Sequence, residues 1–270
     1  MGSTFLISTA ELARCLDSPR LRVLDVRPWP EYAKGHIPNA VHLAKQETDD
    51  LEANRQGLPI KIDKAESLFG GLGIDHETSV VVYGDREDFF GARAFYVLEF
   101  FGHAQLQLLN GGIEGWLHER RGLAREIPQV LPKSFIAQTK PAFIATTELV
   151  KDHLWDPAWV IIDCRDEKRY RASDQRVIRA GHIPGAVNLD ADRLFTYGER
   201  QIFKNQDELL QLFAEHGITR DKEIVTYCTT GGSRSPAAYF ALRLLGFPKV
   251  RVYDAGWIEW GNNLALGVTE

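Results

Sequence analysis

The feature that most constrains the fold of this chain is an internal repeat that spans both halves of its 270 residues. The segment starting at Phe5 returns at Phe143, and the turn Gly35-His-Ile-Pro returns at Gly181. The other repeated segments join Val23 to Ile161, Val80 to Ile224 and Leu108 to Val252. A chain of this kind must fold as two copies of one unit rather than as one large domain.

Each copy has the residue pattern of an α/β domain. Short apolar strands alternate with helical stretches such as 92–101 and 237–245. This alternation is typical of a parallel sheet with helices on both faces. We therefore predict two tandem domains of ordinary size, at 1–125 and 142–270, joined by a proline-containing linker at 126–141. In such sheets a ligand binds beyond the carboxyl ends of the strands.

Composition excludes several classes of protein. The net charge of −5 argues against nucleic-acid binding. No window approaches the roughly 20 apolar residues of a membrane span, and the N-terminus lacks the regions of a signal peptide, so we expect a cytoplasmic protein without a membrane partner. Three widely spaced cysteines favour neither a disulfide framework nor a zinc site. No metal, nucleotide or flavin signature occurs, and we expect no cofactor.

Cys228 stands where a strand-like run, 224–227, meets a glycine-containing loop. Ser235-Pro236 then predicts the start of a helix, with a capping hydroxyl and a proline that needs no amide hydrogen. Gly231 and Gly232 let the backbone curl, so that amide hydrogens point at one centre beside the positive end of the helix dipole. Such an anion cradle stabilises a thiolate over a thiol. This favours a nucleophilic Cys228 over a core cysteine.

Residues that differ between the two copies point to function, whereas shared residues point to architecture. Where the second copy has Cys228, the first has Gly84 and an acidic run at 85–88, so we expect the first copy to be catalytically silent. Arg169 replaces an acidic residue of the first copy and Arg234 opens the helix after the loop, so we expect both to bind an anionic substrate. The residues that we interpret as structural or solvated are Asp25, Asp163, Arg27, Arg165, His36, His182, Cys15, Cys164, Arg171, Arg176 and Arg179.

Together these residues resemble the rhodanese family of sulfurtransferases, in particular its tandem-domain members with a silent N-terminal and an active C-terminal domain. The resemblance covers almost the whole chain, and it rests on Leu24-Asp-Val-Arg27, both Gly-His-Ile-Pro turns, Tyr227-Cys228 with Gly231, and Trp257-Ile-Glu-Trp260-Gly261. It implies that the Cys228 thiolate takes the outer sulfur of thiosulfate, that sulfite leaves, and that the persulfide passes its sulfur to cyanide or another thiophilic acceptor. Arg169 looks like the substrate-binding arginine of the family.

Departures from the family pattern leave other functions open. Thr229 and Thr230 stand where thiosulfate-using relatives often carry cations, and the loop also differs from that of 3-mercaptopyruvate-using relatives, which remain an alternative. The loop is one residue longer than the common form, which gives Arg234 the spacing found in cysteine-dependent phosphatases. A phosphatase or arsenate-handling enzyme of the same fold is therefore a second alternative. A non-catalytic sulfur-carrier module is a third.

We accordingly predict a thiosulfate sulfurtransferase that acts as a monomer on a small anionic sulfur donor, with a thiol or cyanide as acceptor. Cys228 is the predicted catalytic residue. The predicted substrate-binding residues are Arg169, Arg234, Thr229, Thr230, Gly231, Gly232 and Ser233.

Overall fold

A computed structural model of the chain describes residues 5–85, 89–172, 176–196 and 202–269. The chain divides into two compact units, which are described separately. The first unit comprises 1–50, 59–140 and 196–203, and the second comprises 51–58, 141–195 and 204–270. Each unit thus includes one short segment from the other half of the sequence.

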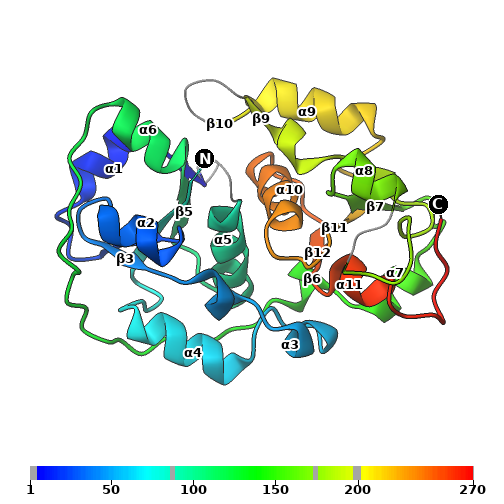
Figure 1. Cartoon of the computed structure of the whole chain (residues 1–270), viewed down its shortest axis with the longest axis horizontal. Coiled ribbons are helices and arrows are strands. Elements are labelled where there is room, and N and C mark those ends of the chain that lie inside the picture. The colour runs from blue at the N-terminus through cyan, green and yellow to red at the C-terminus, as the bar shows by residue number, and fades with distance from the viewer. Residues whose placement is uncertain (1–4, 86–88, 173–175, 197–201, 270) are drawn as a thin grey trace. The chain divides into compact units, whose positions relative to one another are not determined.

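The first unit carries a sheet of five short strands in its described part (Figure 1). These strands are β1 (Leu6–Ile7), β2 (Leu21–Asp25), β3 (Ala40–His42), β4 (Ser79–Tyr83) and β5 (Leu106–Leu109). The helices are α1 (Thr9–Cys15), α2 (Trp29–Lys34), the 3-10 helix η1 (Lys45–Thr48), α4 (Ile62–Gly71), α5 (Phe90–Phe100) and α6 (Gly112–His118).

The second unit repeats this plan. Its main strands are β6 (Ile144–Ala145), β7 (Trp159–Asp163), β8 (Val187–Asn188), β11 (Glu223–Tyr227) and β12 (Val250–Tyr253). Its helices are α3 (Leu51–Arg55), η2 (Pro141–Phe143), α7 (Thr147–Asp152), α8 (Glu167–Arg171), η3 (Ala191–Leu194), α9 (Gln206–Glu215), α10 (Arg234–Leu244) and α11 (Gly256–Trp260). Two further strands, β9 (Phe195–Thr196) and β10 (Ile202–Phe203), pair with each other, and β10 belongs to the segment 196–203 of the first unit.

The two main sheets have the same topology. The strand order is β1-β5-β4-β2-β3 in one and β6-β12-β11-β7-β8 in the other, and the neighbouring strands run parallel. Both central strands are buried apolar runs, as a parallel sheet covered on both faces requires. The register is also repeated, since Asp25 lies opposite Tyr83 and Asp163 lies opposite Tyr227. The predicted α/β fold of two tandem units is confirmed.

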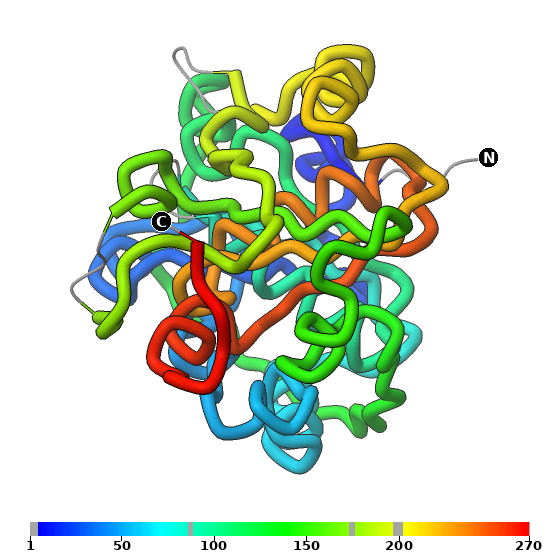
Figure 2. The backbone as a smooth tube through the Cα atoms, turned by 90° about the vertical axis from the view of Figure 1, so that its right-hand side faces the viewer, coloured from blue at the N-terminus to red at the C-terminus, as the bar shows by residue number. Residues whose placement is uncertain are grey.

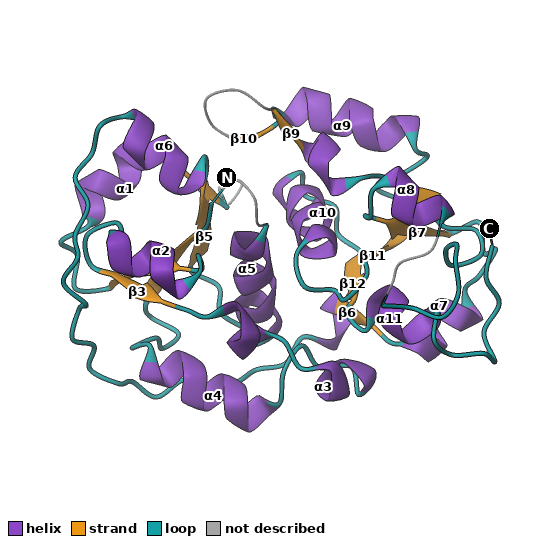
Figure 3. Ribbon diagram, viewed as in Figure 1, coloured by secondary structure: helices purple, strands orange, loops and turns teal. Residues whose placement is uncertain are grey.

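Helices cover both faces of each sheet (Figure 3). In the first unit, α1 and α6 lie on one face and α5 on the other. In the second unit, α7 and α11 lie on one face, where Val225 and Tyr227 join a core with Trp257 and Trp260, while α10 lies on the opposite face. Because side chains alternate along a strand, the residues before and after Tyr227 face α10.

The shared Asp and Arg residues hold the chain together where strands end. Arg165 forms a buried ion pair with Asp163 at 2.6 Å and donates to the Gly181 carbonyl at 2.8 Å, and Arg27 makes the equivalent bonds in the first unit. The His182 ring stacks on Tyr170 with centroids 3.8 Å apart, and its Nδ1 contacts the Tyr170 carbonyl. The structural interpretation of these shared residues is confirmed.

The C-terminal segment of the second unit returns to this same turn. In Figure 2 it runs, in red, away from α11, and Thr269 forms an isolated antiparallel bridge with His182. Arg179 reinforces the segment, because its guanidinium donates to the carbonyls of Trp260, Gly261, Asn263 and Leu266 at 2.6–3.0 Å. Arg179 is therefore a structural residue, whereas the sequence predicts a solvated arginine. In the part of the chain that is described, none of the helices has the length and apolar character needed to cross a membrane.

Candidate active site

Cys228 lies directly after β11 and is 5% exposed. The preceding Thr226 faces α10, because its hydroxyl donates to the Ser235 carbonyl at 3.0 Å. Cys228 points to the same side of the sheet, where the Ser235 hydroxyl donates to its Sγ at 3.3 Å. A hydroxyl donor at this distance stabilises a sulfur that carries negative charge.

Ser235 is the functional residue that the sequence reasoning misassigned. The sequence predicts it as the helix cap, but α10 begins two residues earlier than predicted, with Ser233 at the N-cap position and without a side-chain capping bond. The prediction is wrong because the Ser235 hydroxyl is turned inward to the thiol instead of toward the backbone of its own helix. The only sequence signal for this contact is the side-chain periodicity of the strand before Cys228 and of the helix after it, which determines which side chains face each other.

The loop backbone is fixed by the start of α11. The Trp257 amide donates to the Cys228 carbonyl at 2.8 Å, and the Ile258 amide donates to the Thr229 carbonyl at 2.8 Å. These two carbonyl oxygens are therefore directed at α11. A curled loop held in this way can present backbone amides to an anion.

Close packing beneath the loop explains one of its two glycines. Gly231 has a φ of +64°, and a Cβ placed on it would lie 2.2 Å from both the backbone oxygen and Oδ1 of Asp254. Asp254 is fully buried. The glycine is thus required both for its left-handed backbone and for its contact with this carboxylate. Gly232 and Thr229 are buried, whereas Thr230 and Ser233 are half-buried.

Arg234 forms ion pairs with two acidic side chains. Its Nη1 lies 2.6 Å from Oδ1 of Asp190, and its Nη2 lies 3.2 Å from Oδ2 of Asp192. Asp190 caps η3, since its carboxylate also accepts the Asp192 amide at 3.0 Å. These aspartates are functional candidates that the sequence did not reveal, although the matching positions of the first copy, Ala44 and Gln46, are uncharged.

Arg169 takes no part in this network in the described structure. It belongs to α8, pairs with Asp166 at 3.2 Å and has a side chain that is 45% exposed. No bond joins it to the Cys228 loop among the described residues. Its role in binding a substrate stays a prediction.

Cys164 is the neighbour of Cys228 across the sheet. Its amide donates to the Tyr227 carbonyl at 2.8 Å, and its side chain is fully buried. Burial raises the pKa of the Cys164 thiol well above its ordinary value, with the charges on Cys228, Asp163 and Asp190 adding to this effect and Arg234 opposing it. Cys164 is therefore a protonated core thiol, whereas Cys228 has the donor and the loop that a nucleophile needs.

The first unit has no thiol at the matching position, which is Gly84. Of the acidic run predicted to repel anions, Asp85 is half-buried, while Glu87 and Asp88 lie outside the described residues. In the described part of the chain, no three His, Cys, Asp or Glu side chains are grouped so that they could hold a metal ion.

Comparison with known proteins agrees with this geometry. The model of the rhodanese-like domain matches the chain twice, at residues 8–119 and 146–263. The chain is 32% identical over 263 residues to thiosulfate sulfurtransferase of Pseudomonas aeruginosa, covering 96% of this chain and 94% of that protein. It is 33% identical over 279 residues to the sulfur carrier protein TtuD of Thermus thermophilus, covering 98% and 96%.

The solved structures lead to the same fold. The crystal structure of SseA, a 3-mercaptopyruvate sulfotransferase from Escherichia coli, superposes with a TM-score of 0.85 at 26% identity, over 94% of this chain and 99% of that one. These relatives support sulfurtransferase activity for the chain. The family model matches both halves of the chain, the two sheets share one topology, and a cysteine loop follows the central strand of the second. The chain is therefore a tandem-domain member of the rhodanese family.

Proposed function

We propose that the chain transfers a sulfane sulfur from a small anionic donor to a thiophilic acceptor through a persulfide on Cys228. The observation that carries this proposal is the Cys228 site itself: a thiol at the end of the central strand, a hydroxyl donor 3.3 Å from its Sγ, and a loop whose carbonyls are directed at α11. Thiosulfate is the first candidate donor, because two relatives with similar sequence identity to this chain are named thiosulfate sulfurtransferase.

The reaction runs in two displacements at Cys228. Its thiolate attacks the outer sulfur of thiosulfate, the sulfur–sulfur bond of the donor breaks, and sulfite leaves with the bonding pair. The resulting persulfide then gives its outer sulfur to cyanide or to a thiolate acceptor, which restores the Cys228 thiolate. Negative charge is conserved in both steps, so the site must stabilise anions rather than supply a proton. The amides of the loop and the N-terminus of the eleven-residue α10 suit that task.

Each predicted loop residue has a place in this proposal. Gly231 and Gly232 shape the cradle, Thr229, Thr230 and Ser233 contribute backbone amides, and Ser235 donates to the reacting sulfur. Arg169, being exposed on α8, would meet the donor from solvent. The first unit, with Gly84 in place of the thiol, would serve structure rather than chemistry.

3-Mercaptopyruvate is the second candidate donor, and one observation favours it. The carboxylates of Asp190 and Asp192 offset the charge of Arg234, which reduces the attraction for a dianion such as thiosulfate more than for a singly charged donor. The same observation weighs against a phosphatase, whose arginine must be available to a phosphate dianion.

The test is the initial rate of thiocyanate formation from cyanide, with thiosulfate and 3-mercaptopyruvate supplied in parallel. Wild type and Cys228→Ser are compared, with Cys164→Ser as the matched cysteine variant. We expect turnover with at least one donor, its loss in Cys228→Ser and its retention in Cys164→Ser. Absence of turnover with both donors would contradict the proposal. A Cys228 that accepts sulfur once but does not turn over would instead indicate the sulfur-carrier module.

A further inference from the structure

Two carboxylates pair with the arginine beside the catalytic loop. Arg234 opens α10 at the end of the loop, and its guanidinium bonds both Asp190 and Asp192. The side chains of Arg234 and Asp190 are 23% and 25% exposed, so this contact is partly shielded from water. Two carboxylates thus pair with the one guanidinium and offset the positive charge that the sequence alone predicts at this place.

The fold holds these carboxylates in place. Asp190 follows β8, which pairs with β7, and the Ala191 amide of η3 donates to the Cys164 carbonyl at 3.3 Å. Cys164 is in turn the neighbour of Cys228 across the sheet. The backbone that carries the acidic pair is therefore attached to the strand beside the nucleophile.

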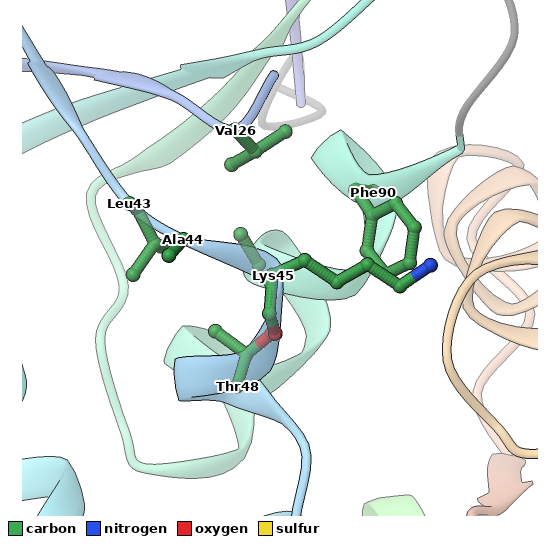
Figure 4. A pocket seen from close by; sticks show the side chains of 7 residues that line it. Val26, Leu43, Ala44, Lys45, Thr48 and Phe90 are labelled. Carbon is green, nitrogen blue, oxygen red and sulfur yellow. The ribbon is translucent and has the colours of Figure 1, made fainter. Parts of the chain in front are cut away.

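The first unit shows what this place looks like without the aspartates and the arginine. The repeat matches Asp190 with Ala44 and Arg234 with Phe90. There the residues enclose a small apolar hollow with no room for a water molecule, lined by Val26, Leu43, Ala44, Lys45, Thr48, Phe90 and Ala94 (Figure 4). The Lys45 ammonium lies over the Phe90 ring, 3.6 Å from its centroid. The acid–arginine cluster thus belongs to the copy that carries the thiol.

We propose that Asp190 and Asp192 determine the charge specificity of the Cys228 loop: by balancing Arg234 they make the loop discriminate against doubly charged sulfur donors in favour of singly charged or neutral ones. This inference rests on the proposed sulfur transfer for its biological meaning. Its physical content, a field at Cys228 that these two carboxylates make more negative, can be measured without any sulfur donor.

The direct test compares the alkylation of Cys228 by two reagents of nearly the same shape, iodoacetate with one negative charge and iodoacetamide with none. Labelling of the Cys228 peptide is followed by mass spectrometry, which separates it from Cys15 and Cys164. The ratio of the two rate constants cancels the reactivity of the thiol and reports the potential that an approaching anion meets. The variants are Asp190→Asn and Asp192→Asn, which keep the shape of each side chain and remove its charge.

We expect each substitution to raise the iodoacetate to iodoacetamide ratio about three- to sixfold at low ionic strength, the effect of one unit charge at a half-exposed site, and less in high salt. Asp190→Glu should restore the wild-type ratio. Asp221→Asn is the matched control, because it removes the same charge at the opposite end of β11. Ratios for Asp190→Asn and Asp192→Asn that equal those of wild type and Asp221→Asn would overturn the inference.

The assay with the two sulfur donors then tests whether this charge effect changes the donor preference. In Asp190→Asn and Asp192→Asn, the KM for thiosulfate should fall about threefold or more relative to the KM for 3-mercaptopyruvate. An unchanged KM ratio in variants that do turn over would overturn the inference. The two failures are distinguishable, because a wild type inactive with both donors contradicts the proposed function and leaves the alkylation result to decide the charge effect.

Discussion

The substitution Gly231→Ala should destabilise the catalytic loop in two ways, through backbone strain and through a steric clash. The φ of +64° alone costs an alanine about 1–2 kcal/mol. The added Cβ would also lie 2.2 Å from two oxygens of Asp254 and 2.7 Å from its Cα. Because Asp254 is fully buried and two of these atoms are backbone, it cannot turn away, and such overpacking costs a further 1–3 kcal/mol, roughly. We expect the free energy of unfolding to fall by about 2–5 kcal/mol.

Gly217→Ala separates the two contributions. Gly217 has a φ of +70°, almost the value at Gly231, but no atom lies within 4 Å of a Cβ added there. It follows α9 in the same unit. Its substitution should therefore cost only the backbone strain, about 1–2 kcal/mol. The difference between the two variants isolates the contact with Asp254.

Urea denaturation measures both losses of stability, and thiocyanate formation measures activity. Relief of the clash must move the loop, and a displacement of the reacting sulfur by about 1 Å costs on the order of 100-fold in rate. We expect that loss of kcat/KM in Gly231→Ala and nearly full activity in Gly217→Ala. Equal stability losses for the two variants, together with full activity of Gly231→Ala, would refute the reasoning.

Three further results should follow. Ser235→Ala removes the donor 3.3 Å from Sγ and should slow iodoacetamide alkylation of Cys228 about tenfold at neutral pH, whereas an unchanged rate would show that the hydroxyl does not support the thiolate. Arg179→Gln removes bonds to four carbonyls and should lower the free energy of unfolding by about 2–4 kcal/mol in urea titrations, with an effect below 1 kcal/mol speaking against the structural role. Burial lowers the pKa of His103, so the unfolded chain binds a proton on this ring more readily than the folded chain does. The free energy of unfolding should therefore fall as the pH drops below about 6.5, and His103→Phe should make that fall smaller. The same pH slope in wild type and His103→Phe would contradict this assignment.

The repeat made the sequence informative about architecture. A strand run followed by a loop and an apolar helix is a local pattern, and its recurrence predicted the sheet, the helices on both faces and the structural Asp–Arg pairs. The pairs Asp25–Arg27 and Asp163–Arg165 could be predicted because they join residues two positions apart at a strand end. The loop around Cys228 was predictable for the same reason, since the cysteine, the glycines and the following helix are contiguous.

The contacts that the sequence did not reveal join residues that are distant along the chain. Asp190 and Asp192 meet Arg234 across more than forty positions, and nothing local in the sequence indicates that contact. Ser235 was assigned to the helix cap because propensity favours serine there, yet tertiary packing turns it toward Cys228. Asp254 was not singled out, because nothing local indicates that it lies beneath Gly231.

The sequence by itself therefore determined the duplicated α/β plan, the location of the thiol and the loop that surrounds it, because these depend on periodicity and on turn residues that are close along the chain. Only the tertiary structure decided the charge around the thiol. That charge depends on which strand ends meet at the edge of the parallel sheet, and the order β8-β7-β11 brings the carboxylates of η3 to the arginine of α10.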